Sequence, residues 1–450
     1  MEGLILNTGT KFMAAGATAG AVAAGIPVVY GLVRNMMPKP LDENDRLRVE
    51  NGSFYAQNGA MIFLRGINLN DELFFFKKNG MDMPAKNYDI FDAFEERFGR
   101  YGARKLIQTY NENFISSADL KSIKKLGANC VRIPLRYRSL FRKESCKGDI
   151  DFDYLDGVIE ACRKAGLYVI LDLHSAPGYQ NNDSACPSNS ESILFDSSKA
   201  AFEARNAVIR LWTQVAAHYK DEPSIAAFDL LNRPLNKTAL WQEKTDALNK
   251  FYLRLYKAIR TVDSERILIM QSPHSTEELP VFDSPVKNIA YGLYSHFNTT
   301  FETDALVEGI KKIKNRDIPV VISKLRSEDN TEYLLTGLSD NGVSWLFGDF
   351  KGPEGCGCLY TGSPEPADFD TDNFDAITEK WTKPLATKNF TLNKELAKTL
   401  KNYFGYGCVS FSSSEKAEKK IPVRIKVRFG SNIVIGKNSD KKLKLKDKKS

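Results

Sequence analysis

Short apolar runs alternate with longer amphipathic stretches along most of this chain. Eight runs of strand length recur, at residues 61–67, 128–134, 167–173, 225–231, 266–270, 289–294, 318–323 and 342–347. Between them, apolar residues return at helical spacing, as in Leu155, Val158, Ile159 and Cys162. Eight strands alternating with helices predict an α/β fold with a parallel sheet, and eight strands can close into a (β/α)8 TIM barrel.

Both ends of the chain differ from this body. Residues 12–33 carry no charge, a length that suits one membrane span. A cleaved signal peptide and an Ala-rich helix are the alternatives. Residues 37–48 are polar and Pro-rich, as a linker would be. We therefore expect a hydrophobic anchor or signal segment at 1–36, a linker at 37–48, and a membrane-associated or extracytoplasmic protein.

The barrel is expected to occupy residues 49–405, opened by a β-hairpin that turns at Asn58-Gly59. Residues 406–450 are expected to form a basic hairpin and tail, because apolar and basic residues alternate from 421 to 429 and a turn leads into 433–435. The Lys-rich tail at 437–449 is either a solvated end or a segment attracted to an anionic surface.

Composition adds few constraints. Apolar residues make up 42% and charged residues 26%, which excludes a disordered chain, a collagen and a polytopic membrane protein. The net charge is +7, but residues 411–450 hold 13 Lys and Arg against 4 Asp and Glu. The body is thus nearly neutral, and we expect no specific nucleic-acid partner. We also expect no metal and no cofactor, because the four histidines lack zinc-ligand spacing.

The seven cysteines are too few for a disulfide scaffold. Cys146 and Cys186 could bridge, whereas Cys356 and Cys358 stand too close together for an ordinary structural disulfide.

Polar residues stand at the ends of five predicted strands, where the active sites of such barrels lie. They are Arg132, His174, Asn232, His296 and Lys324. A polar group on an apolar strand costs free energy unless it meets a partner or a ligand. Their recurrence at one rim predicts a pocket.

Several segments resemble glycoside hydrolase family 5, the retaining β-glycosidases of the cellulase family. They are Leu64-Arg-Gly-Ile-Asn68, Val131-Arg-Ile-Pro134, the stretch 166–174, and Tyr219-Lys-Asp-Glu-Pro223 continuing to Asn232. The resemblance runs from about residue 49 to 388. The stretch 175–181 is similar to the branch that contains fungal exo-β-1,3-glucanases.

The resemblance implies a role for each matching position. Arg132 would orient the nucleophilic carboxylate, His174 would bond sugar hydroxyls, and Asn232 would contact the sugar 2-hydroxyl. His296 would stand beside the acid/base group, and Trp345 would form the aromatic floor under a sugar ring.

Three positions depart from the family pattern. Arg233 replaces the acid/base glutamate, Lys324 replaces the nucleophilic glutamate, and Asn298 stands where the family has tyrosine. Retaining hydrolysis needs two carboxylates, and arginine cannot shuttle a proton near neutral pH. We therefore predict a homologue that is not an enzyme and that binds a glycan or an acidic ligand, or acts as an interaction module.

The sequence is also compatible with other interpretations. Arg233 and Lys324 could pair with local acids such as Asp172 and Asp229, or could bind an acidic sugar, a phosphate or a sulfate. The chain could also be an active β-glycosidase whose carboxylates have moved, for example to Glu277, Glu278 or Glu328. A third possibility is an assembly protein that uses the barrel as a scaffold.

Overall fold

The computed structural model describes residues 39–69, 75–78, 81–82, 90–141, 148–181, 192–235, 241–273, 276, 279–283, 285–296, 299–314, 317–326, 330–405, 426–429 and 432–435. The chain divides into two units, Met1–Lys39 and Pro40–Ser450. The predicted anchor segment at 12–33 and the Lys-rich tail lie outside the described residues. None of the described helices combines the length and the apolar character needed to cross a membrane.

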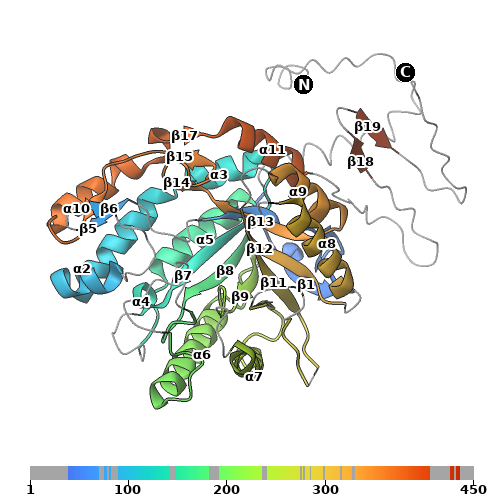
Figure 1. The fold of residues 1–450 in the computed structure, drawn as a ribbon, viewed down its shortest axis with the longest axis horizontal. Coiled ribbons are helices and arrows are strands. Elements are labelled where there is room, and N and C mark those ends of the chain that lie inside the picture. The colour runs from blue at the N-terminus through green and yellow to red at the C-terminus, as the bar shows by residue number, and fades with distance from the viewer. Residues whose placement is uncertain are drawn as a thin grey trace, which may run out of the picture. The chain divides into compact units, whose positions relative to one another are not determined.

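Eight parallel strands close into a barrel, which confirms the predicted fold (Figure 1). In chain order they are β4 (Arg65–Asn68), β7 (Cys130–Arg136), β8 (Tyr168–Ser175), β9 (Ile225–Asp229), β10 (Ile267–Gln271), β11 (Ile289–His296), β12 (Val320–Arg326) and β13 (Ser344–Asp349). Each strand pairs with the next, and β13 returns to β4. All eight strands therefore end at one edge, called the carboxyl-terminal rim below.

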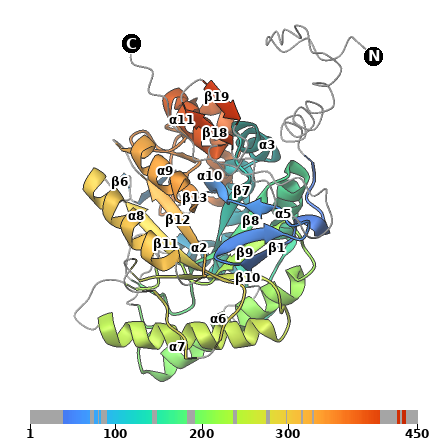
Figure 2. The same ribbon diagram turned by 90° about the vertical axis from the view of Figure 1, so that its right-hand side faces the viewer.

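Helices lie outside the barrel (Figures 1 and 2). They are α2 (Ile90–Phe114), α3 (Ser117–Leu126), α4 (Tyr137–Leu140), α5 (Asp153–Ala165), α6 (Lys199–Tyr219), α7 (Trp241–Arg260), α8 (Thr300–Lys314), α9 (Thr331–Asp340) and α11 (Lys394–Phe404). Helix α5 buries the predicted apolar positions Leu155, Ile159 and Cys162. It ends at Gly166, whose left-handed φ of 70° a glycine adopts without strain. The described part of the β10–β11 connection contains no helix.

Alternation along the strands divides the core into two layers. Ile170, Ile269 and Leu346 pack inside the barrel, whereas Val169, Leu268 and Phe347 pack between the strands and the helices. Because successive side chains of a strand point to opposite faces, a barrel strand is apolar on both sides and forms a continuous apolar run. This is why the runs could be located from the sequence.

The segment before the barrel, where a linker was predicted at 37–48, contains regular structure. Asp42 caps the 3-10 helix η1 (Glu43–Asp45) in a reciprocal capping box with Asp45. Strands β1 (Leu47–Glu50), β2 (Ser53–Ala56) and β3 (Met61–Ile62) follow and form an antiparallel sheet. The predicted hairpin at Asn58-Gly59 joins β2 to β3 and is confirmed.

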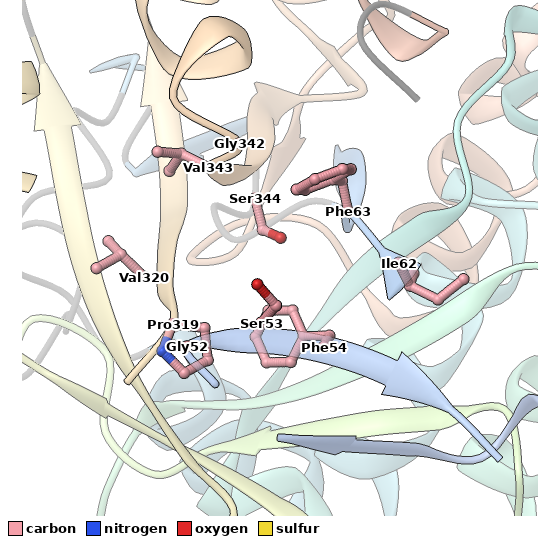
Figure 3. Close-up of a pocket in the computed structure, with 10 residues that line it drawn as sticks. All are labelled: Gly52, Ser53, Phe54, Ile62, Phe63, Pro319, Val320, Gly342, Val343 and Ser344. Carbon is pink, nitrogen blue, oxygen red and sulfur yellow. The ribbon is translucent and has the colours of Figure 1, made fainter. Parts of the chain in front are cut away.

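A small pocket opens at the amino-terminal end of the barrel, opposite the rim (Figure 3). It lies between the β2–β3 hairpin and the starts of β12 and β13, and its lining includes Ser53, Phe54, Val320 and Ser344. The Ser344 hydroxyl accepts a hydrogen bond from the backbone N–H of Leu64 at 3.0 Å. The pocket therefore lies where the β2–β3 hairpin covers the amino-terminal end of the barrel.

Beyond β13 the chain builds an extension against α2. Its elements are β14 (Lys351–Gly352), β15 (Tyr360–Thr361), β16 (Ala367–Asp368), α10 (Phe374–Trp381), η2 (Lys383–Leu385), η3 (Thr387–Asn389) and β17 (Thr391–Leu392). Strand β5 (Phe76–Lys78) pairs with β16 on one side and with β6 (Met81–Asp82) on the other. An aromatic cluster of Phe76, Phe94, Tyr110 and Trp381 fills the space between them. Near the end of the chain, β18 (Lys426–Phe429) and β19 (Asn432–Ile435) form the predicted C-terminal hairpin.

A disulfide joins Cys356 to Cys358, contrary to the expectation from their spacing. Gly357 between them has a left-handed φ of 68°, and the two Cα atoms are 5.4 Å apart, within the usual range for a disulfide. Cys130 and Cys162 are free and buried. Cys146 and Cys186 lie outside the described residues.

Lys351, two residues after the end of β13, is fully buried. Its Nζ donates to the carbonyl of Leu385 at 2.6 Å and to the hydroxyl of Thr387 at 3.1 Å. The same nitrogen lies 4.3 Å from the ring centre of Phe114 and 4.7 Å from that of Phe390. Burial lowers the pKa of Lys351 to about 7, although Asp119 acts in the opposite direction.

This burial predicts a pH-dependent contribution to stability. Between pH 7 and 10 the unfolded state binds more protons at Lys351 than the folded state does, so stability rises with pH through this residue. The difference in unfolding free energy between wild type and Lys351→Met should change by about 1 kcal/mol per pH unit in that window. Urea titrations at several pH values measure it, and the exposed Lys388→Met is the control. A pH-independent difference would contradict a buried, titrating Lys351.

Candidate active site

Arg132, the third residue of β7, is the centre of a buried polar network near the rim. Its Nε and Nη2 donate to Oδ2 of Asp229 at 3.0 and 2.8 Å, and Nη2 also lies 2.8 Å from Oδ1 of Asp172. Nη1 donates to Asn68 at 3.2 Å, and Nη2 reaches Asn232 at 3.1 Å. One guanidinium therefore joins strands β4, β7, β8 and β9 and holds two carboxylates close together.

Asp172 and His174 lie two residues apart on β8 and therefore face the same side. His174 Nδ1 lies 2.7 Å from Oδ2 of Asp172. Because a carboxylate accepts, Nδ1 is the donor and a neutral His174 keeps Nε2 as an acceptor. The Asn232 amide nitrogen faces Nε2 at 3.4 Å, while its oxygen accepts from Arg132. Arg132, His174 and Asn232, all predicted site residues, are thus brought together.

Asp229, the last residue of β9, is fully buried. Burial raises the pKa of its carboxyl to about 6, and Asp172 acts in the same direction, while Arg132 and Gln271 act against it. Gln271 Nε2 donates to Oδ2 at 2.8 Å. Among the described residues, Oδ1 of Asp229 has no hydrogen-bond partner. This carboxyl group can therefore change its protonation near neutral pH.

Lys324, which the resemblance places where the family has its nucleophile, is buried in β12. Its Nζ lies 3.3 Å from Oδ2 of Asp349, the last residue of β13, which is also buried. The pairing of β12 with β13 is irregular between Ile322 and Leu325, and Lys324 falls inside this irregularity. Lys324 thus pairs with an acid, as one of the interpretations from the sequence had it, but the acid is Asp349.

Arg233 follows Asn232 at the rim and is half-buried. Its φ of 43° lies in the left-handed region that non-glycine residues rarely adopt. Its backbone N–H donates to Oε1 of Gln271 at 3.0 Å, and its carbonyl accepts from the side chain of Asn181. Its guanidinium lies over the ring of Tyr294, 4.4 Å from the ring centre. Arg132 holds Asp172 and Asp229, the two acids that the sequence offered as partners of Arg233.

Trp345 does not lie where the resemblance implied. It is fully buried, and its ring stacks on Phe404 of α11 with centres 5.3 Å apart. The alternation of β13 directs Leu346 into the barrel and Trp345 outward to the helices. Trp345 consequently presents no ring face to a sugar. His296 ends β11 at the rim, but its side chain, like the whole of Asn298, lies outside the described residues.

Three polar residues of this site do not stand out in the sequence. Asn68, Gln271 and Asp349 are each the last residue of a barrel strand. The apolar runs predicted from the sequence end at residues 67, 270 and 347, one or two residues before these three polar side chains. The possible replacement carboxylates Glu277, Glu278 and Glu328 lie outside the described residues.

Comparison with known proteins supports the resemblance. Residues 91–351, more than half of the chain, match the family model described as Cellulase (glycosyl hydrolase family 5). A Beta-xylosidase of Phanerodontia chrysosporium is 30% identical over 260 residues, which cover 56% of this chain and 52% of the relative. A Glucan 1,3-beta-glucosidase of Candida oleophila is 30% identical over 217 residues, covering 44% and 48%. The chain spans about half the length of these curated relatives.

Among solved structures, a crystal structure of an endogalactoceramidase superposes with a TM-score of 0.51 at 15% identity. The match covers 75% of this chain and 84% of that one, and it shows a shared fold. The prediction that the chain is not an enzyme is wrong on these comparisons, because the family model and the matched relatives are glycoside hydrolases. That prediction depended on the side chains at Arg233 and Lys324, and the comparisons favour the alternative interpretation, a β-glycosidase.

Proposed function

Because the chain belongs to glycosyl hydrolase family 5, we propose that it hydrolyses β-linked O-glycosidic bonds with carboxylates other than those of the two positions that carry Arg233 and Lys324. The observation that carries this proposal is the pair of carboxylates, Asp172 and Asp229, held on one nitrogen of Arg132 beside His174 and Asn232.

The chemistry sets the requirement. A retaining glycosidase needs one carboxylic acid to protonate the leaving oxygen and a second carboxylate about 5–5.5 Å away to attack the anomeric carbon. Arg233 and Lys324 are both basic side chains, and Lys324 lies against Asp349. Neither side chain can supply a carboxylate, so an active enzyme must take both groups from elsewhere.

Asp172 and Asp229 are our candidates for these two groups. An oxygen of each lies 2.8 Å from the same Nη2, so those oxygens are no more than twice that distance apart. We assign Asp229 to proton transfer, because its pKa of about 6 lets it carry a proton near neutrality. We assign Asp172, which Arg132 and His174 contact, to attack on the anomeric carbon. Both carboxylates are fully buried.

The test is turnover by the purified protein on a panel of glycoside substrates, chosen to match the activities named for its relatives. The panel comprises aryl β-xylosides, aryl β-glucosides, β-1,3-glucan and β-1,4-glucan, because the relatives are a β-xylosidase, glucan 1,3-β-glucosidases and endoglucanases. We expect sustained release of sugar from at least one member. No turnover on any of them, by a folded sample, would contradict the proposal.

A second experiment identifies the attacking group. A 2-deoxy-2-fluoro glycoside traps the covalent intermediate of a retaining enzyme, and peptide mapping locates the label. Labelling of Asp172 is the expected result. A label on Glu277, Glu278 or Glu328 would keep the hydrolase and reject the assignment of Asp172. The variants Glu277→Gln, Glu278→Gln and Glu328→Gln provide the matching kinetic comparison.

A further inference from the structure

The disulfide between Cys356 and Cys358 lies in the loop between β14 and β15 and closes a ring that contains only one further residue, Gly357. A disulfide stabilises a fold mainly by restricting the unfolded chain, and this effect grows with the length of the loop that the bond closes. So small a ring restricts the unfolded chain very little. The bond is therefore poorly placed for a structural role, and opening it should leave the fold intact.

Backbone hydrogen bonds hold the end of this loop independently of the sulfur atoms. The N–H of Tyr360 donates to the carbonyl of Phe350 at 2.9 Å, and the N–H of Gly362 donates to the carbonyl of Gly352 at 3.1 Å. Leu359, which follows Cys358 directly, is fully buried. None of these contacts needs the S–S bond, so the pairing of β14 with β15 can persist when the two cysteines are reduced.

The two cysteines differ in their access to solvent. Cys356 is half-buried and stands between two exposed glycines, Gly355 and Gly357. At both glycines, no atom from elsewhere in the chain lies within 4 Å of the place that a Cβ would take. Cys358, in contrast, is only 1% exposed. A thiolate from solution can therefore reach Cys356 more readily than Cys358.

The free cysteines of the described residues are not suited to the same chemistry. Cys130 and Cys162 are fully buried, and burial raises the pKa of both thiols. Because the thiolate is the form that reacts, these two cysteines stay unreactive in the folded protein. Among the described cysteines, reaction with an external thiol is therefore expected at the pair in the β14–β15 loop.

We propose that Cys356 and Cys358 form a thiol-exchange site, which reacts reversibly with small thiols of the glutathione class while the barrel stays folded. The external thiolate attacks Sγ of Cys356, a new S–S bond forms there, and the bond to Cys358 breaks. The electron pair passes to Sγ of Cys358, which takes up a proton. The inference is independent of the proposed hydrolysis.

A second thiol completes the exchange. Its thiolate attacks the sulfur of the bound small thiol, and the products are a small-molecule disulfide and the thiolate of Cys356, which is then protonated. Two thiols are thus oxidised to one disulfide, and the protein disulfide is reduced to two thiols. The reverse sequence, with oxidised glutathione as the oxidant, closes the ring again.

The first test follows the ring in the folded protein. The full chain is incubated with reduced and oxidised glutathione in a series of ratios, free thiols are alkylated, and peptide mapping gives the state of Cys356 and Cys358. We expect the pair to open as the ratio rises and to close when oxidised glutathione is restored, while circular dichroism and the urea midpoint stay nearly unchanged. A pair that opens only in urea, or that stays reduced in excess oxidised glutathione, would overturn the inference.

Two single variants test which sulfur is attacked. Cys358→Ser leaves the half-buried thiol, and Cys356→Ser leaves the buried one. With oxidised glutathione, Cys358→Ser should form a glutathione adduct at this loop at least about tenfold faster than Cys356→Ser, because its thiol is the accessible one. The control is Cys162→Ala, which removes a buried free thiol and should open and close like the wild type. Equal rates in the two serine variants, or no adduct in either, would also overturn the inference.

Discussion

Replacement of Asp229 by asparagine is expected to lower kcat/KM on the best substrate of the panel by about 10²- to 10⁴-fold, the usual contribution of a general acid. Asparagine keeps the shape of the side chain and can still accept from Arg132 and Gln271, but it has no proton to transfer. Steady-state kinetics with an aryl glycoside measures the loss. A substrate with a very good leaving group should lose less, because it needs little protonation.

The matched control is Asp263→Asn. Asp263 is also a buried aspartate paired with an arginine, Arg266, but it precedes β10 at the opposite end of the barrel. Asp263→Asn should lower the stability of the protein but leave kcat/KM of the folded fraction unchanged. Equal losses of kcat/KM in both variants would assign Asp229 a structural role only.

The pH profile gives a further check on Asp229. A general acid must be protonated, so kcat/KM of the wild type should fall as pH rises through about 6, the raised pKa of this carboxyl. The profile of Asp229→Asn should lack that limb. If kcat/KM of the variant still falls above about pH 6, the titrating group is a residue other than Asp229.

Replacement of Arg132 by methionine is expected to lower the free energy of unfolding by about 3–5 kcal/mol, the cost of breaking a buried ion pair by removing one partner. The variant leaves Asp172 and Asp229 adjacent, buried and without their cation. Because Arg132 opposes the rise in the pKa of Asp229, its removal lets that pKa rise further. The loss should therefore be smaller at pH 5 than at pH 7.5, and urea titrations at both pH values measure it.

A double variant separates the charge from the packing at this position. Arg132→Met with Asp229→Asn removes one of the two like charges and should recover part of the lost stability at pH 7.5. No recovery would mean that the cost comes from packing or from the contacts of Arg132 with Asn68 and Asn232.

The barrel could be predicted because its strands are buried on both faces, which leaves uninterrupted apolar runs in the sequence. The run at 61–67 shows the limit of that signal. It contains the end of the first sheet, β3, and the first barrel strand, β4, which the pattern alone cannot separate. Likewise, an all-apolar strand has no alternation of polar and apolar residues to show which side faces inward, so the sequence pattern could not place Trp345 in the outer layer.

The polar network was harder to predict, because its partners come from distant strands. Arg132, His174 and Asn232 are marked by local motifs, but the partner of Lys324 is Asp349, 25 residues further along and at the end of a different strand. The resemblance places Arg233 and Lys324 where two glutamates are expected. The contacts that these two cations make in the fold cannot be predicted from their spacing in the sequence. Lys324 is compensated inside the barrel, whereas Arg233 lies over an aromatic ring at the rim.

The pairing of β13 with β4 has a consequence for biosynthesis. The Leu64 backbone bonds to Ser344, 280 residues later, so a ribosome must make almost the whole barrel before its first strand gains its second neighbour. Until then the growing polypeptide carries an exposed strand edge, the kind of surface on which nascent chains associate wrongly. Truncation before residue 344 should therefore yield aggregates rather than a smaller folded protein.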